Sequence, residues 1–281
     1  MPVTRFAPSP TGRLHRGHAY SALMAYRAAQ ESGGRFLLRI EDIDATRCQP
    51  EFESAIFEDL AWLGVTWEEP VRRQSRHRQD HEEALQRLQA DGVLYRCFRT
   101  RREMAAQAQS APHAHEQPFF GAPLPPAEEA ARLLAGEPFA WRLSIQAARE
   151  RLGDFSGLAF LETGSGPQGE TGALLARPDR AGDIVLARKD VGLSYHLAVV
   201  VDDALQGVNH VVRGQDLFEA VHAQRLLQAL LGLPTPVYRH HSLLVGADGK
   251  RYAKRNKSET LAEIRQSGLS AADLRRELGF F

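Results

Sequence analysis

The N-terminal stretch constrains the fold of this chain most, because it reads as strand, loop, helix and strand in one short run. Residues 3–6 predict a short strand, and the proline- and glycine-rich residues 7–14 predict a loop. The apolar positions that follow recur at helical spacing until Gly33 and Gly34, which favour a helix end. Residues 36–40 then predict a buried strand. Two strands joined by a helix favour a parallel sheet, whose ligands bind beyond the carboxyl ends of the strands.

The loop ahead of this helix ends in two histidines that predict a phosphate site. His15 and His18 flank Gly17 at positions i and i+3, so both side chains share one face at the helix start. The unpaired N–H groups and the positive dipole end of a helix attract phosphate at that place. We therefore expect nucleotide chemistry at the top of this unit. An ordinary surface turn with two exposed histidines is the alternative that the motif alone leaves open.

Composition narrows the class of protein without identifying it. The chain has 281 residues, 43% of them hydrophobic, which allows about two domains. Its 35 Lys and Arg balance its 35 Asp and Glu, so nucleic acid would need a local basic face. Cys48 and Cys97 are too few for a disulfide framework, and the sequence shows no apolar signal segment or membrane span. We expect a monomeric cytoplasmic protein that makes no membrane contact.

The rest of the chain continues the alternation of helices and strands, with one irregular interruption between Cys97 and Gly182. The apolar patterns predict helices over 50–63, 77–91 and 217–231, strands over 183–188, 194–201 and 208–212, and extended structure over 237–245. Alanine, glutamine, proline and glycine dominate the interruption. We therefore predict an α/β domain formed by residues 1–98 and 183–245, an inserted subdomain over 99–182, and a loop with short helices over 246–281.

A second basic segment, near the C-terminus, has two interpretations. Residues 249–257 carry lysines and arginines around Tyr252 and Ala253. Charge runs of this kind usually form a solvated surface. A lysine such as Lys254 could instead contact the phosphates of a bound nucleotide, because phosphoryl transfer needs positioning and positive charge. The spacing alone does not choose between these interpretations.

Four ordered blocks of the sequence resemble the class I aminoacyl-tRNA synthetases in their glutamate-specific form. The blocks are residues 5–18, 39–47, 202–217 and 251–255, the last with Lys254 in the place of the catalytic lysine. The resemblance covers most of residues 3–110 and 180–260. It implies an α/β fold with a Rossmann-type catalytic domain, an inserted acceptor-binding-like subdomain and a short helical C-terminal region, without an anticodon-binding domain.

The resemblance also implies a role for each matching residue. The catalytic positions are His15, His18 and Lys254, which bind ATP together with Gly17. The glutamate-binding positions are Arg5, Ala7, Ser9, Glu41, Tyr195 and Arg213. An arginine can hold a carboxylate with two hydrogen bonds, and a carboxylate can pair with the α-ammonium of an amino acid. A core tyrosine at 195 and an ion pair between Arg213 and Asp216 are the plain alternatives.

The implied reaction is ATP-dependent activation of L-glutamate, with Mg²⁺ accompanying the nucleotide. Because the sequence stops soon after Lys254, it is similar to a shorter branch of the family that transfers glutamate to the queuosine base in the anticodon of tRNA(Asp). Two alternatives stay open. A shortened enzyme could charge the 3′ end of tRNA, and the altered residues Arg251 and Ala253 could mark an inactive tRNA-binding paralogue.

The chain departs from the family at a metal site. Members often hold zinc with a Cys-x-Cys pair and a later tyrosine and cysteine, whereas this chain keeps only Cys97 of that set. Tetrahedral zinc needs four ligands, preferably thiolates or imidazoles. His113 and His115 could substitute, but a His-x-His sequence among prolines is typical of a surface tract. We predict no structural zinc.

Overall fold

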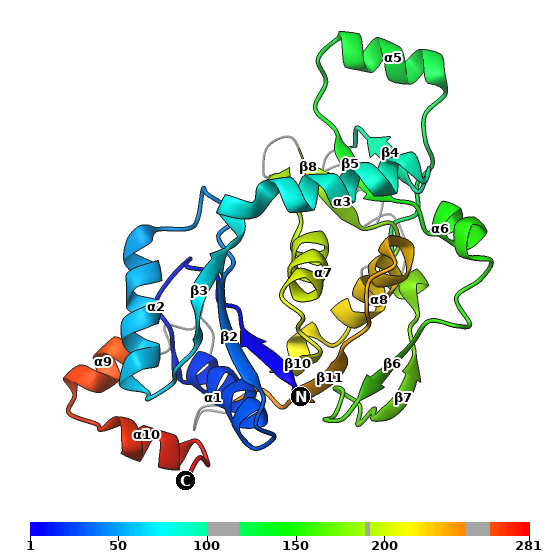
Figure 1. The fold of residues 1–281 in the computed structure, drawn as a ribbon. Coiled ribbons are helices and arrows are strands. Elements are labelled where there is room, and N and C mark those ends of the chain that lie inside the picture. Colours follow the sequence, from blue (N-terminus) through cyan, green and yellow to red (C-terminus); the bar gives the residue numbers. More distant parts are fainter. Residues whose placement is uncertain (100–117, 189–191, 245–258) are drawn as a thin grey trace, which may run out of the picture.

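The N-terminal part of the fold forms as the sequence predicts. The computed structural model describes residues 1–99, 118–188, 192–244 and 259–281. Strand β1 (Val3–Phe6) pairs in parallel with β2 (Arg35–Ile40), and helix α1 (Arg16–Gln30) is the crossover between them. β3 (Glu68–Arg73) pairs in parallel with β2 and follows helix α2 (Pro50–Trp62). The predicted βαβ unit and the helix predicted over 50–63 are therefore confirmed (Figure 1).

The second half repeats this arrangement and continues the layer of strands. β10 (His210–Gly214) pairs in parallel with β11 (Val237–His241), and α8 (Ala220–Leu231) connects them. β10 lies beside β1, because the Val3 N–H donates to Asn209 Oδ1 at 2.7 Å and the Asn209 N–H donates to Val3 O at 3.2 Å. In Figure 1 the strands β2, β1, β10 and β11 run side by side, so their carboxyl ends meet along one edge.

The strand predicted over residues 194–201 is wrong. Residues Tyr195–Leu205 form helix α7, and the Ser194 side chain caps it by accepting from the Leu197 N–H. Every position from Leu197 to Asp203 is buried, so the helix carries no polar stripe there. A short, continuous apolar run is common to buried strands and buried helices. The serine cap is the one local sign of a helix in this stretch.

Two further strands widen the C-terminal half of the layer. β6 (Ala159–Glu162) pairs in parallel with β11, and β7 (Gly172–Leu175) pairs antiparallel with β6. A separate antiparallel sheet consists of β4 (Leu94–Cys97), β5 (Ala140–Leu143), β8 (Val185–Arg188) and β9 (Gly192–Leu193). The sheets thus do not follow the boundaries predicted at 98 and 183, because β6 and β7 join the parallel layer and β8 pairs elsewhere.

Five further α-helices lie within the described ranges. They are α3 (Arg78–Ala90), α5 (Pro126–Leu134), α6 (Ile145–Leu152), α9 (Leu261–Gln266) and α10 (Ala271–Glu277), with 3-10 turns at Gln74–His77, Pro178–Arg180 and Gln215–Leu217. α3 and α8 confirm the predicted second and third helices. α9 and α10 lie beside α1 and α2 in Figure 1, where Leu261 and Leu274 are fully buried. None of the helices within the described ranges has the length and apolar character needed to cross a membrane.

Candidate active site

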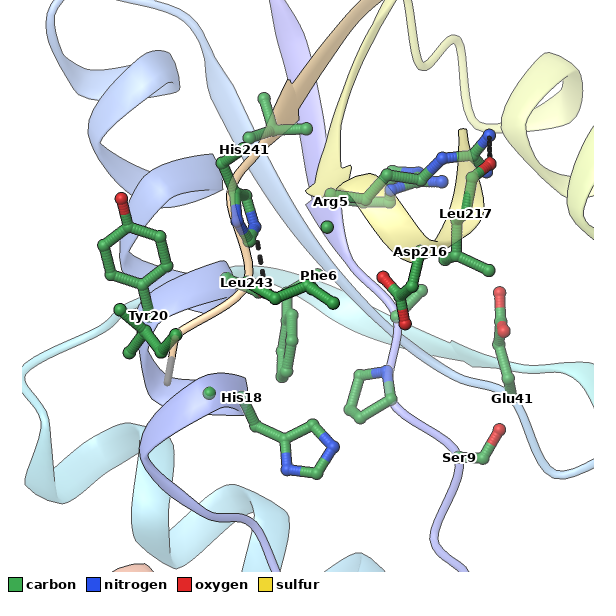
Figure 2. Close-up of a pocket in the computed structure, with 18 of the residues that line it drawn as sticks. Arg5, Phe6, Ser9, His18, Tyr20, Glu41, Asp216, Leu217, His241 and Leu243 are labelled. Carbon is green, nitrogen blue, oxygen red and sulfur yellow. Dashed lines mark hydrogen bonds between the residues drawn. The ribbon is translucent and has the colours of Figure 1, made fainter. Parts of the chain in front are cut away.

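A cavity of about 460 Å³ opens where β1, β2, β10 and β11 end. Figure 2 shows side chains from these strand ends and from α1 around it. Nine predicted site residues line it: Arg5, Ala7, Ser9, His15, Gly17, His18, Glu41, Tyr195 and Arg213. Lys254, the remaining predicted residue, lies outside the described residues. Residues from distant parts of the sequence therefore meet at one place, as predicted.

The two histidines form the first turn of α1. His15 is the N-cap, and its Nδ1 accepts from the Gly17 N–H at 3.1 Å. His18 Nδ1 accepts in turn from the His15 N–H at 3.2 Å, and the ring centroids lie 3.8 Å apart. Since each Nδ1 is an acceptor, the neutral form of each ring carries its proton on Nε2. The helix start predicted here is confirmed, and it fixes which ring nitrogens can donate to an anion.

Arg5 and Glu41 belong to a cluster of ion pairs at the strand ends. Arg5 Nε lies 3.0 Å from Asp203 Oδ1, and the fully buried Arg39 lies 2.6 Å from the same oxygen. Glu41 is 3.6 Å from Arg39. Burial raises the pKa of Glu41 to about 7, although the charges of Arg39 and Arg5 act to lower it. The two arginines hold the pKa of Asp203 below its usual range against the effect of burial. Within this cluster, Glu41 is therefore the carboxylate whose pKa lies near neutral pH.

The neighbouring carboxylate, Asp202, connects the two halves of the molecule. It accepts from Arg72 Nε at 2.7 Å and Gln74 Nε2 at 2.8 Å, and its Oδ1 lies 2.9 Å from His81 Nε2. Burial would raise the pKa of Asp202, but the hydrogen bond with His81 and the charge of Arg39 bring it to about 2. Successive residues of α7 thus bind different partners, Asp203 two arginines and Asp202 one arginine with a glutamine and a histidine, which fixes the helix against β1–β3.

Arg213 at the end of β10 donates to four side-chain and backbone acceptors. Nη1 donates to the Tyr195 hydroxyl at 3.3 Å, and Nη2 donates to Leu217 O and Gln224 Oε1, both at 3.0 Å. Nε donates to His240 Nε2 at 3.0 Å. Tyr195 is therefore a cavity residue in the first turn of α7, held by an arginine, and not a tyrosine enclosed in the core.

None of the carboxylates in the described ranges forms an ion pair with Arg213. The alternative of an ion pair between Arg213 and Asp216 is therefore wrong: Asp216 lines the cavity and is among the side chains labelled in Figure 2. Arg5, in contrast, is paired with Asp203. A buried guanidinium whose partners are neutral is suited to an anionic ligand, because a ligand carboxylate supplies the missing negative charge.

The sequence analysis missed one wall of the cavity. His241 Nδ1 donates to Ser242 O at 3.0 Å, so its Nε2 accepts from the Ser21 hydroxyl, also at 3.0 Å. The Tyr20 ring meets the His241 ring edge-on with centroids 5.0 Å apart, and Leu243 lies nearby (Figure 2). Helical spacing from the second histidine would have indicated Ser21. This wall combines an aromatic ring, an aliphatic side chain and hydrogen-bonding groups, the mixture that lines small-molecule sites.

The residues that flank the basic segment border the cavity. Leu244, the last described residue before it, lines the cavity. Beyond it, Thr260 forms an antiparallel bridge with His15. The described residues on either side of 245–258 therefore lie at or beside the cavity.

Metal ligands are not clustered in the part of the chain that the structure describes. No group of three or more His, Cys, Asp or Glu residues there could hold a metal ion. Cys97 is a buried free cysteine at the end of β4. His113 and His115 lie outside the described residues, so the absence of structural zinc remains a prediction.

Comparisons with known proteins agree with this architecture. A family model of the class I tRNA synthetases (E and Q), catalytic domain, matches residues 2–152 and 169–278. A glutamyl-Q tRNA(Asp) synthetase of Rhodobacter capsulatus is 46% identical, with 99% of each chain covered. One from Symbiobacterium thermophilum is 41% identical over 95% of this chain and 82% of its own. A solved glutamate tRNA ligase of Elizabethkingia meningosepticum, in complex with its amino acid, superimposes with a TM-score of 0.75 at 26% identity, covering 95% of this chain and 53% of the ligase.

The fold and the site therefore define a class I tRNA synthetase catalytic domain, and the chain belongs to the E and Q family of these enzymes. Within that family, the match over nearly the whole length of both chains places it with the glutamyl-Q tRNA(Asp) synthetases. A glutamate–tRNA ligase of Prochlorococcus marinus is 35% identical, but this chain spans only 55% of it.

Proposed function

We propose that this chain activates L-glutamate with ATP and Mg²⁺ and transfers the glutamate to the queuosine base of tRNA(Asp). The relatives of nearly equal length that bear this name support the second step. One observation carries the first step: the cavity combines Glu41 with two arginines, of which Arg213 has no carboxylate partner among the described residues. The cytoplasmic location and the monomeric state remain predictions.

We assign the charged groups of glutamate by what the reaction requires. The α-carboxylate must attack phosphorus, so it lies toward His15 and His18 at the helix start. The α-ammonium then pairs with Glu41, and Ala7 and Ser9 border the amino acid. The side-chain carboxylate binds Arg213, whose positive charge is otherwise uncompensated. The Tyr195 hydroxyl holds this arginine in place.

We assign ATP to the opposite wall. Its base lies against Tyr20 and Leu243, and its phosphates lie at the first turn of α1, beside Gly17. The Nε2–H groups of the two histidines donate to phosphate oxygens, and Lys254 supplies a further positive charge. Mg²⁺ accompanies ATP as part of the substrate.

The proposed chemistry needs positioning more than proton transfer. An α-carboxylate oxygen attacks the α-phosphorus in line, forming the O–P bond of glutamyl-adenylate, while the bond to the β-phosphate oxygen breaks and pyrophosphate leaves. The nucleophile is already ionised, so no general base is needed. A nucleophilic group of the queuosine base then attacks the carbonyl carbon of the adenylate and gives up its proton to solvent, while the bond from that carbon to the phosphate oxygen breaks and AMP leaves.

Activation is tested by glutamate-dependent exchange of labelled pyrophosphate into ATP in the absence of tRNA. We expect exchange with glutamate and none with glutamine or without amino acid. A chain that shows no exchange under any of these conditions would be the inactive tRNA-binding paralogue, and the proposed function would be wrong.

The role of Lys254 makes a separate prediction. Lys254→Ala should lower kcat for exchange by roughly 100-fold or more, with a much smaller effect on KM for ATP, because the lysine acts mainly in the transition state. Lys257→Ala, which removes a charge from the same segment, is the matched control and should stay near the wild-type rate. An unchanged exchange rate in Lys254→Ala excludes this role.

A second candidate function is transfer to the 3′ end of tRNA. The 35% identity to a glutamate–tRNA ligase favours it. Both functions share the activation step, so only the destination of glutamate separates them.

A further inference from the structure

A buried carboxylate and imidazole adjoin Arg213, and the imidazole contacts a different nitrogen of the guanidinium from the one that contacts the Tyr195 hydroxyl. Glu162 ends β6 and His240 lies in β11, and both side chains are fully buried. His240 Nδ1 lies 2.6 Å from Glu162 Oε2, and His240 Nε2 accepts from Arg213 Nε at 3.0 Å. The three side chains form one hydrogen-bonded row that leads to the cavity.

The donors in this row determine the state of the imidazole. Arg213 always donates, so His240 Nε2 carries a lone pair and the ring proton is on Nδ1. That proton is donated to Glu162, whose other oxygen accepts from the Gly164 N–H at 2.7 Å and the His240 N–H at 2.9 Å. Burial lowers the pKa of His240, which keeps the ring neutral. The tautomer follows from the geometry alone.

We propose that Glu162 and His240 are positioning residues that orient Arg213 for the side-chain carboxylate of the substrate while keeping its charge available. A carboxylate placed directly on Arg213 would compete with that of the substrate for the guanidinium, and Arg213 differs in this respect from Arg5, which is paired directly with Asp203. Because the His240 imidazole lies between Glu162 and Arg213, the Glu162 carboxylate orients the guanidinium through the imidazole and does not occupy the nitrogens that the substrate carboxylate needs. This inference rests on the proposed function, which assigns that carboxylate to Arg213.

The anion comes from a segment outside the family match. Residues 153–168 separate the two ranges that the family model covers, and β6 lies within them. The same segment also contacts the 3-10 turn that follows β10, because Gln215 Nε2 donates to Ser165 O at 2.8 Å and Gly166 O at 3.0 Å. None of residues 153–168 lines the cavity, and the segment acts on it indirectly, through the hydrogen bonds of Glu162 and Ser165.

The variant Glu162→Gln tests the proposal, because it keeps the size of the side chain. Its oxygen can still accept the two backbone N–H groups, but its NH₂ then faces His240 Nδ1. The ring must place its proton on Nε2, opposite the donor Nε of Arg213. We expect KM for glutamate to rise at least tenfold, KM for ATP to stay within twofold, and the preference for glutamate over glutamine to fall. Glu170→Gln, in the same hairpin, is the matched control and should behave as wild type.

A proportional rise in both KM values, or an unchanged KM for glutamate, would overturn the proposal. Nitrogen-15 NMR of the histidine rings in the wild-type protein tests it without an activity measurement, with the His240 signals assigned by their loss in His240→Asn. We expect the Nδ1–H tautomer in the wild-type protein and the Nε2–H tautomer in Glu162→Gln. A His240 ring that is an imidazolium, or that carries its proton on Nε2, in the wild-type protein would contradict the proposed hydrogen bonds from Arg213 to His240 and from His240 to Glu162. If the tautomer is as expected but wild type shows no exchange, the proposed function fails and the row of hydrogen bonds stands.

Discussion

Glu41 is the residue whose chemistry depends most on its surroundings. It is only 8% exposed, and its nearest cation, Arg39, is already 2.6 Å from Asp203. Burial therefore outweighs the arginine charges and raises its pKa to about 7. An arriving α-ammonium adds a positive charge at this point and favours the ionised form. Binding of the amino acid and loss of a proton from Glu41 are thus coupled.

This coupling predicts a pH dependence. Below pH 7 the free site holds Glu41 mostly protonated, so KM for glutamate should fall about tenfold per pH unit as pH rises toward 7, and level off above it. Pyrophosphate exchange measured from about pH 6 to about pH 8.5 checks this. In Glu41→Gln the KM should be high and lack this transition. A wild-type KM that is flat across the range contradicts the assigned role.

Single residues were predictable where the signal is local. Helix starts and strand ends are local features, so the positions of His15, His18, Arg5 and Glu41 could be predicted from the sequence, whereas the family resemblance supplied the roles of Arg5 and Glu41. The partners of Arg213 could not, because Glu162 and His240 meet it through pairing of distant strands. The raised pKa of Glu41 could not be predicted from the sequence either, since it depends on burial.

The β6–β7 hairpin is the element that the sequence described least well. Its glycine-rich turn indicated an irregular insertion, whereas β6 adds a strand to the parallel layer. Its close approach to β11 depends on Gly164, where a Cβ would lie 2.2 Å from His240 O. Helix α7 is a second error, because its continuous apolar run predicted a strand where the structure has a helix. In both cases tertiary pairing, which local patterns lack, decided the structure.

The approach at Gly164 predicts a stability effect. Gly164→Ala should lower the free energy of unfolding by roughly 1–3 kcal/mol, because a Cβ must push β6 away from β11, and KM for glutamate should rise as Glu162 moves. Gly157→Ala is the control in the same segment, since a Cβ there meets nothing within 4 Å. Chemical denaturation of both variants checks this. Equal stability of the two would show that the strands tolerate separation.

At the scale of the whole molecule, α7 and the strand ends make one site from two halves of the chain. Asp203 binds Arg5 and Arg39 of the first half, while Asp202 binds Arg72. The glutamate pocket thus exists only when both halves are assembled. The βαβ pattern of the sequence predicted parallel strands whose carboxyl ends meet at one edge. The cavity, which residues from these strand ends line, confirms that prediction.

The destination of glutamate tests the central claim most directly. Labelled glutamate, ATP and the protein are incubated with tRNA(Asp) whose terminal adenosine lacks both ribose hydroxyls, carrying either queuosine or guanosine in the anticodon. Ribonuclease fragments are then analysed for label. We predict label in the anticodon fragment of the queuosine form and none in the guanosine form. Labelling that requires the 3′-terminal hydroxyls and ignores queuosine would contradict the account.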